Sequence, residues 1–322
     1  MKIAVIDDYQ DAFRKTKAFS KLKGHDVQVF TDTEKDPEKL AARLKDADAV
    51  VLTQQRSPFP RAVIERLPKL KLISQTGRNA YHIDLAACAE KGITVSAGGG
   101  GGGPNATAEL TWALLLAHLR HIPQEVQRMK DGKWQATIGV GLKGKTLGVY
   151  AYGKIGSVVA NVGRAFGMKV ICLGREASTG RAREAGFEAT QDRASFFENA
   201  DIVTLHLPLN KETRGIVTAA DLARMKPSAV LVNTSRAPIV EEGALVAALK
   251  KGRPGSAAVD VYESEPVLNR EHPLITMDNV TCTPHLGYVE ESGYEGIYGT
   301  AVDQIVAFAE GKPINVATAE KS

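Results

Sequence analysis

Short runs of β-branched and aliphatic residues alternate with charged segments of helical length along most of this 322-residue chain. In the first hundred residues the apolar runs occupy 3–6, 27–30, 49–52, 70–74 and 93–96, and charged segments at 11–23, 36–46, 60–67 and 84–91 separate them. Six further runs follow at 146–150, 168–173, 201–207, 229–233, 256–262 and 279–283. Strands and helices in alternation build βαβ units with parallel strands. The chain is therefore expected to be an α/β protein with two Rossmann-like domains, each a doubly wound parallel sheet.

Six consecutive glycines at 98–103 separate the two series. Successive glycines bend easily, so this run is expected to act as a hinge between domains, and Pro104 and Asn105 favour the start of a helix after it. The helical segment 106–129 is interrupted by Pro123 and is too apolar in its first half for a single exposed face. We expect it to be buried between elements or between subunits.

The last helical segment, 290–310, follows the second series of strands. A terminal helix often returns to complete the first domain of a two-domain chain. The predicted domains are a discontinuous flavodoxin-like substrate domain, formed by 1–100 and 288–322, and a dinucleotide-binding Rossmann domain, 101–287.

The composition argues against several classes of partner. A formal charge of +4, from 41 basic and 37 acidic side chains, is small for this length, and no block of like charges forms an arm for nucleic acid. Cys88, Cys172 and Cys282 lie in apolar stretches, as buried free thiols of a reducing compartment do. The N-terminus has the pattern of a strand rather than a signal peptide, and no apolar run is long enough for a membrane span. We expect a cytoplasmic protein without a metal site, a nucleic-acid partner or a membrane partner.

A glycine-rich turn, Ala151-Tyr152-Gly153-Lys154-Ile155-Gly156, follows the expected strand 146–150 directly. A helix and a further strand come next, so this is the G-x-G-x-x-G dinucleotide-binding pattern in its usual context, with alanine in place of the first glycine. Amides at the helix N-terminus would face a pyrophosphate. The Ala151 methyl group is tolerable only if φ is negative there. A glycine-punctuated turn without a ligand is the alternative.

The end of the next strand bears on the choice of cofactor. NAD-binding units usually carry Asp or Glu there to bind the ribose 2′-hydroxyl, whereas this chain has Gly174 and Arg175. A guanidinium can bind a 2′-phosphate through two hydrogen bonds. NADP is therefore the favoured cofactor, and NAD is the alternative because Glu176 could bind the ribose instead.

Three segments at the ends of expected strands carry the chemistry: NTSRAPIV at 233–240, DVYESEP at 260–266 and TPHLGY at 283–288. Ligands bind at the carboxyl ends of strands in an open parallel sheet. Arg236, Glu265 and His285 would supply a cation for the substrate, a carboxylate to charge and hold the proton donor, and that donor. The alternatives are that Glu263 takes the place of Glu265, and that Arg236 only pairs with Glu241 or Glu242 in a structural role.

These segments resemble the signature motifs of the D-isomer-specific 2-hydroxyacid dehydrogenase family, which includes phosphoglycerate, glyoxylate/hydroxypyruvate and D-lactate dehydrogenases. The resemblance covers almost the whole chain and includes 108–109, 166–168 and 206–208. It implies hydride transfer between NAD(P)H and C2 of a small 2-keto or D-2-hydroxy acid that is similar to glyoxylate or hydroxypyruvate. It also implies a homodimer.

The resemblance further implies residue roles. Arg236 would bind the substrate carboxylate and polarise the carbonyl, His285 would be the general acid/base, and Glu265 would hydrogen-bond His285. Backbone amides of the loop Gly77-Arg78-Asn79 would bind the substrate carboxylate. The predicted cofactor contacts are Tyr152, Gly153, Lys154, Ile155, Gly156, Arg175, His206, Pro208, Thr213, Thr234, Ser235, Asp260 (at the nicotinamide carboxamide) and Gly287.

The chain also departs from the family's pattern. Ala237 replaces the usual glycine after the arginine, and the loop 77–84 keeps only its first glycine and its final Ile-Asp. Arg78, Tyr81 and His82 could therefore change what the pocket accepts. The alternative function is a dimeric, corepressor-like protein that senses NAD(H) and has little turnover.

Overall fold

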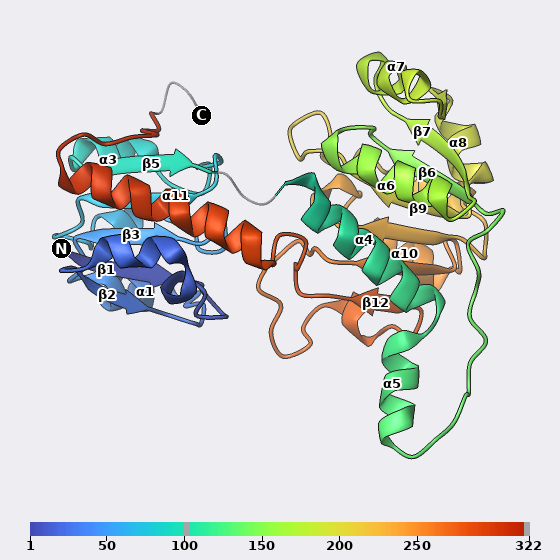
Figure 1. The fold of residues 1–322 in the computed structure, drawn as a ribbon, viewed down its shortest axis with the longest axis horizontal. Coiled ribbons are helices and arrows are strands. Elements are labelled where there is room, and N and C mark those ends of the chain that lie inside the picture. Colours follow the sequence, from blue (N-terminus) through green and yellow to red (C-terminus); the bar gives the residue numbers. More distant parts are fainter. Residues whose placement is uncertain (100–102, 319–322) are drawn as a thin grey trace. The chain divides into compact units, whose positions relative to one another are not determined.

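The computed structural model describes residues 1–99 and 103–318. The chain divides into two compact units, Met1–Gly103 with Tyr288–Ser322, and Pro104–Gly287. Three glycines of the predicted hinge, 100–102, lie outside the described residues. Each unit is built on one parallel sheet (Figure 1). The α/β class with two Rossmann-like sheets, expected from the alternation of runs, is confirmed.

The first unit contains a five-stranded sheet in the order β2-β1-β3-β4-β5. Its strands are β1 (Lys2–Ile6), β2 (Asp26–Val29), β3 (Ala49–Leu52), β4 (Leu72–Thr76) and β5 (Thr94–Gly98). Successive side chains of a strand point to opposite faces. Ile3 and Val5 of β1 pack with the C-terminal helix α11 (Glu291–Ala309) on one face, and Ala4 and Ile6 belong to the core on the other. Helix α11 therefore completes the core of the first unit.

Three helices cover the other face of this sheet: α1 (Pro37–Leu44), α2 (Arg61–Ile64) and α3 (Leu85–Glu90). The charged segment 11–23 was expected to be a helix of ordinary length. It forms two short 3₁₀ helices instead, η1 (Phe13–Lys15) and η2 (Lys17–Leu22). Asp8 accepts hydrogen bonds from the amides of Ala12 and Phe13, and these local bonds compete with a regular helix.

The second unit contains a seven-stranded parallel sheet in the order β12-β11-β10-β9-β6-β7-β8. Its strands are β6 (Thr146–Tyr150), β7 (Lys169–Leu173), β8 (Glu188–Thr190), β9 (Ile202–Leu205), β10 (Val230–Asn233), β11 (Ser256–Val259) and β12 (Val280–Cys282). The sequence predicted six of them and missed the three-residue edge strand β8. The strand order reverses between β6 and β9, and ligands bind at such a switch point in doubly wound sheets.

Helices cover both faces of the second sheet. Its helices are α4 (Pro104–Leu119), α5 (Ile122–Lys130), α6 (Lys154–Ala165), α7 (Glu176–Glu184), α8 (Arg193–Asn199), α9 (Ala219–Arg224) and α10 (Ala244–Lys250), with 3₁₀ helices η3 (Ala237–Ile239) and η4 (Pro273–Thr276). Helices α4 and α6 lie side by side on one face, and α8, α9 and α10 pack on the other (Figure 1). The break between α4 and α5 falls at His121, which has φ +53°. Among the residues described, no helix has the length and apolar character needed to cross a membrane.

Candidate active site

The glycine-rich turn connects β6 to α6 at the switch point of the second sheet. Gly153 is the N-cap of α6, and no side chain caps the first amides of this helix. A Cβ at Gly156 would lie 2.2 Å from the carbonyl oxygen of Ala151, so only glycine lets the helix come this close to the strand. A Cβ at Gly153 would meet no described atom within 4 Å. The turn therefore leaves space in front of uncapped amides, which suits a pyrophosphate.

Ala151 adopts φ +76°, in the left-handed region that favours glycine. The negative φ that an alanine needs to fit this turn without strain is therefore not found. We expect Ala151→Gly to raise the free energy of unfolding by roughly 0.5–1 kcal/mol, because glycine has no left-handed penalty but loses more entropy on folding. Ala177→Gly, at an exposed position of α7, is the control and should lower stability by roughly 0.5–1 kcal/mol. Urea unfolding measures both values. A loss of stability in Ala151→Gly would contradict the strain.

Two residues that the sequence analysis did not single out hold this turn in place. Ser178 accepts a hydrogen bond from the Tyr152 amide at 2.8 Å, and Arg181 donates to the Tyr152 carbonyl at 3.0 Å. The Tyr152 ring is buried beside Phe187. Tyr152 thus supports the turn rather than presenting its side chain to a ligand. Ser178 and Arg181 lie on α7, and no motif in the sequence marks them.

The loop after β7 carries the residues predicted to choose the cofactor. The Arg175 side chain is 87% exposed, and its Nη1 lies 3.3 Å from the Glu212 carboxylate. Glu176, the predicted alternative ligand for the ribose, is bound by Arg183 and accepts a hydrogen bond from the Gln191 amide at 2.6 Å. Arg175 is therefore the exposed cation at this strand end, while the Glu176 carboxylate is occupied.

His206 directly follows β9, on the other side of the switch point. Its Nε2 lies 3.0 Å from the Thr204 hydroxyl, and burial lowers the pKa of His206 to about 4. Its Nδ1 is buried and has no hydrogen-bond partner within 1–99 and 103–318. Buried polar atoms are rarely left unpaired. This nitrogen and the uncapped N-terminus of α6 together fit a dinucleotide.

Thr213 stabilises the loop that follows His206. Its hydroxyl donates a hydrogen bond to the Pro208 carbonyl at 2.6 Å.

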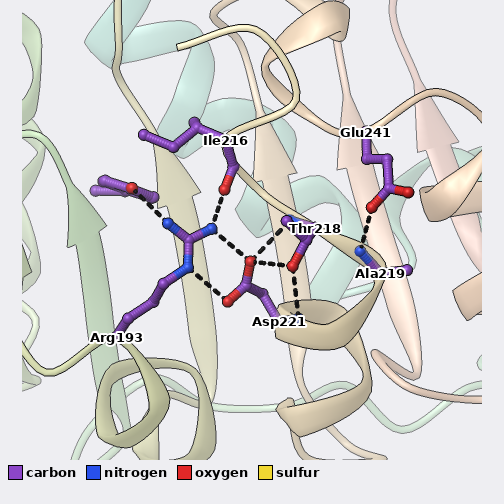
Figure 2. A network of polar contacts seen from close by, with 7 residues as sticks. Arg193, Ile216, Thr218, Ala219, Asp221 and Glu241 are labelled. Atoms are coloured by element: carbon purple, nitrogen blue, oxygen red, sulfur yellow. Dashed lines mark hydrogen bonds and ion pairs between the residues drawn. The ribbon is translucent and has the colours of Figure 1, made fainter. Parts of the chain in front are cut away.

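An ion pair between the partly exposed Arg193 and the buried Asp221 fixes the segment that follows this loop (Figure 2). Arg193 of α8 binds both carboxylate oxygens of Asp221, with Nε 2.6 Å from Oδ1, and also donates to the Ile216 carbonyl. The Asp221 carboxylate accepts the Thr218 amide at 2.7 Å and the Thr218 hydroxyl accepts the Asp221 amide at 3.3 Å, which together form a capping box at the start of α9. The Thr218 hydroxyl also lies 2.6 Å from the Asp221 carboxylate. Burial opposes the ionisation of Asp221, yet the hydrogen bonds from Arg193 and Thr218 keep the pKa of its carboxyl below the usual value.

Arg193→Met should lower the free energy of unfolding at pH 7 by about 2–3 kcal/mol, because it leaves the charged Asp221 carboxylate buried without its cation. The loss should shrink as the pH falls below about 4, where protonation removes that charge. Arg224→Met is the matched control. Arg224 forms a half-exposed ion pair with Glu198 between the same two helices, and its loss should cost under about 1 kcal/mol. Equal losses in urea unfolding of the two variants would contradict the role of the Arg193–Asp221 pair.

Arg236 lies in the turn after β10, where Thr234 is buried and Ser235 is partly exposed. The Asn233 side chain shapes this turn: it accepts the Ser235 amide at 3.0 Å and donates to the Arg236 carbonyl at 3.1 Å. The half-buried guanidinium of Arg236 donates to the Ser235 carbonyl at 2.8 Å. Glu241, one of its predicted structural partners, accepts a hydrogen bond from a backbone amide of α9.

The structure brings His285 and Glu265 together. Glu265 Oε2 lies 2.6 Å from His285 Nδ1, and the two side chains are 16% and 17% exposed. A carboxylate can only accept, so Nδ1 carries a proton and Nε2 is the nitrogen that can exchange one with a substrate. Glu263, the predicted alternative to Glu265, lies 2.8 Å from Nε2 of His272. The region thus contains two His–Glu pairs, and Glu265 is the partner of His285.

Asp260, after β11, is bonded to the turn that carries His285. Its carboxylate accepts hydrogen bonds from the Thr283 hydroxyl at 2.6 Å and from the amides of Leu286 and Gly287 at 2.7 and 2.9 Å. These bonds hold a turn in which His285 has φ +54°. Asp260 was expected at the nicotinamide carboxamide, and the contacts found show it holding this turn. The chemical residues thus follow three neighbouring strands, β10, β11 and β12.

The predicted carboxylate-binding loop follows β4 in the first unit. The Gly77 amide donates to the Gly98 carbonyl at 3.1 Å, so one of the three predicted amides is already bonded. Arg78 and Asn79 are exposed. His82 has both ring nitrogens buried without a hydrogen bond among the described residues, and burial lowers its pKa to about 4. The amides of Arg78 and Asn79 are therefore those that this loop can offer to a ligand.

A family model agrees with this arrangement. The model described as "D-isomer specific 2-hydroxyacid dehydrogenase, NAD binding domain" matches residues 112–287. This range includes the glycine-rich turn and the three strand ends that carry Arg236, Asp260 and His285.

Relatives match nearly the whole chain. A glyoxylate reductase of Thermococcus litoralis is 34% identical over 300 residues, which are 90% of this chain and 89% of that protein. A D-3-phosphoglycerate dehydrogenase of Methanocaldococcus jannaschii is 38% identical over 293 residues, and this chain spans only 54% of its length. The crystal structure of a phosphoglycerate oxidoreductase from Vibrio cholerae is similar with a TM-score of 0.92 and 47% identity, over 97% of this chain and 99% of that one. The chain belongs to the D-isomer specific 2-hydroxyacid dehydrogenase family.

Proposed function

We propose that this protein is a nicotinamide-dependent oxidoreductase that interconverts a small 2-keto acid and its D-2-hydroxy acid. The observation that carries the proposal is the His285–Glu265 pair at 2.6 Å, in a turn held by Asp260. Arg236 lies two strands away at the same edge of the sheet. His285 and Arg236 both follow strands at their carboxyl ends, as the cofactor turn does, and this supports the roles of proton donor and substrate cation that we propose for them.

Arg236, His285 and Glu265 have separate roles in the proposed reduction. A bound reduced nicotinamide supplies the hydride for C2 of the keto acid. Arg236 binds the carboxylate and polarises the carbonyl, and His285 Nε2 donates its proton to the carbonyl oxygen. Glu265 accepts the Nδ1 proton, which fixes the orientation of the ring and stabilises its charged form. In the oxidation direction neutral His285 takes the hydroxyl proton.

The substrate we propose is glyoxylate or hydroxypyruvate. The glyoxylate reductase of similar length to this chain supports this choice. The test is a panel of glyoxylate, hydroxypyruvate, 3-phosphohydroxypyruvate, pyruvate and 2-ketoglutarate, each assayed with NADH and with NADPH. The highest kcat/KM should fall on one of the first two acids. A rate no higher than the cofactor blank for the whole panel would overturn the function and would favour the sensor alternative.

We propose NADP(H) as the preferred cofactor. The support is the exposed Arg175 at the end of β7 together with the engagement of Glu176 by Arg183 and Gln191. A carboxylate that is held by two donors is poorly available to a ribose hydroxyl. The Arg175 guanidinium can exchange its exposed partner Glu212 for a 2′-phosphate at little cost, because an exposed ion pair contributes little free energy.

Arg175→Ala should lower kcat/KM with NADPH by about 10–100-fold, because charge-assisted hydrogen bonds to the 2′-phosphate are lost. The KM for NADH should stay within about threefold, since that cofactor lacks the phosphate. Steady-state kinetics with both cofactors measure the two values. A wild-type preference for NADH, or an unchanged NADPH preference in the variant, would refute this assignment.

We also propose a homodimer. Helix α5 has no buried residue, yet Ile122, Val126 and Met129 form an exposed apolar stripe on it. Trp134 and Ile138 in the following extended segment are 74% and 94% exposed. Such a surface indicates a protein contact, and a second copy of the chain is the commonest partner of this kind. Light scattering should give twice the chain mass for the wild type and the monomer mass for a Trp134→Asp/Ile138→Asp variant. A monomeric wild type would overturn the proposal.

A further inference from the structure

Two threonines of helix α4 contact the turns of the second unit that carry Arg236 and His285. Thr111 Oγ1 lies 2.7 Å from Thr234 Oγ1, and the two residues are 1% and 5% exposed. One helical turn earlier, the Thr107 hydroxyl donates to the Gly287 carbonyl at 2.8 Å. Thr234 is two residues before Arg236, and Gly287 is two residues after His285. Neither threonine of α4 belongs to a motif used above.

The direction of the hydrogen bond between Thr111 and Thr234 follows from a second contact. Thr111 Oγ1 also lies 2.7 Å from the Thr107 carbonyl oxygen, which can only accept. The single hydroxyl proton of Thr111 is therefore used on its own helix, and the Thr234 hydroxyl must donate to Thr111. Thr234 then presents only lone pairs to any other group. It can accept a hydrogen bond from a ligand but has no proton left to donate.

Thr107 helps to hold the turn that carries His285. The turn that carries His285 is held on one side by Asp260, through the amides of Leu286 and Gly287. Thr107 holds the same turn from the other side, through the Gly287 carbonyl. A Cβ at Gly287 would lie 3.3 Å from Asp260 Oδ2 and 3.5 Å from Thr107 Cγ2, so the turn fits closely between them.

We propose that Thr111 and Thr107 are positioning residues of the hydride-transfer site. Thr111 makes Thr234 an acceptor for a donor group of the bound dinucleotide, such as a ribose hydroxyl. Thr107 keeps the turn that carries His285 in a fixed position at the end of β12. This inference rests on the proposed function, because it takes the nicotinamide half of the cofactor to bind beside Thr234.

Five single variants and one double variant separate positioning from packing. Thr111→Val and Thr107→Val keep the side-chain shape and remove the hydroxyl, and Thr111→Ser restores it. Thr300→Val is the matched control, because Thr300 makes the same bond to a carbonyl four residues earlier, Gly296 at 2.9 Å, on α11 of the first unit. The readouts are the Kd of NADPH and NADH from fluorescence titration, kcat, the KM of the keto acid, and the melting temperature.

Thr111→Val should raise the Kd of both cofactors about fivefold, since Thr234 loses the acceptor that orients its proton. Thr111→Ser should return the Kd to within about twofold of the wild type. Thr234→Val should give a similar rise, and Thr111→Val/Thr234→Val should add little to it, because the two hydroxyls act as one unit. Thr107→Val should lower kcat about tenfold and leave the cofactor Kd unchanged, because it acts on the turn of His285. Thr300→Val should change none of these values.

Cofactor Kd values within twofold of the wild type in Thr111→Val, with only the melting temperature lowered, would show that Thr111 is structural and would overturn its part of the proposal. An unchanged kcat in Thr107→Val would do the same for Thr107. If the wild type binds the cofactor but reduces no keto acid, the proposed function fails, and the Kd comparison still decides the role of Thr111. If the wild type binds neither dinucleotide, both proposals fall.

Discussion

His285→Asn is expected to lower kcat for keto-acid reduction by about 10²–10⁴-fold, the contribution that a placed general acid makes. Asparagine cannot carry the proton that Nε2 donates to the carbonyl oxygen. His272→Asn is the matched control, because His272 forms the other His–Glu pair of the region, with Glu263 at 2.8 Å. Its kcat should stay within about threefold of the wild type. Steady-state rates with saturating cofactor measure both.

Comparable losses in the two histidine variants would contradict a specific role for His285.

Glu265→Gln tests the role of Glu265, the hydrogen-bond partner of His285. The neutral amide no longer places a negative charge beside Nδ1, so kcat should fall about tenfold or more in both directions. If kcat of Glu265→Gln stays within about twofold of the wild type, Glu265 does not support the proton transfer.

Arg236→Lys is expected to lower kcat and raise the KM of the keto acid together, each by about tenfold or more. An ammonium is a point charge and cannot present the guanidinium fork to a carboxylate and a neighbouring carbonyl at once. The cofactor Kd should change by less than about twofold, because the proposed function assigns the guanidinium to the substrate and not to the cofactor. Initial rates over a matrix of keto-acid and cofactor concentrations give these values.

A rise in KM without a fall in kcat would mean that Arg236 contributes only uniform binding and does not polarise the carbonyl in the transition state. An unchanged KM would return Arg236 to a structural role in the turn after β10.

Strong local patterns were enough to predict most of the sheet framework. Strands β3 and β6 begin and end where their apolar runs do, at 49–52 and 146–150. Strand β8, Glu188–Thr190, has three residues at the sheet edge and only partial burial, so it leaves no apolar run to detect. The segment 11–23 does not form a regular helix, because the amides of Ala12 and Phe13 donate to the Asp8 carboxylate. Asp8 is in this position because it follows β1, and the charge pattern of the segment does not reveal that.

The order of motifs along the chain predicted that Arg236, Asp260 and His285 follow neighbouring strands, but not which contacts each of them makes. Glu263 and Glu265 are two residues apart, and only the fold shows that the first binds His272 and the second His285. The backbone angle of Ala151 likewise depends on how closely α6 approaches β6. Thr107 and Thr111 lie four residues apart and so share one face of α4, but the helix also carries Asn105, Glu109 and His118, so the two hydroxyls do not stand out in the sequence. Their partners lie more than a hundred residues away, where no local pattern can place them.

The configuration of the product formed from hydroxypyruvate tests the proposed hydride transfer most directly. Purified protein is incubated with NADPH or NADH and hydroxypyruvate, cofactor oxidation is followed by absorbance, and the glycerate is resolved by chiral chromatography. The proposed function predicts D-glycerate in one-to-one ratio with oxidised cofactor, and its loss in His285→Asn. Formation of L-glycerate would contradict it, as would cofactor binding without reduction of hydroxypyruvate, glyoxylate or any other keto acid of the panel.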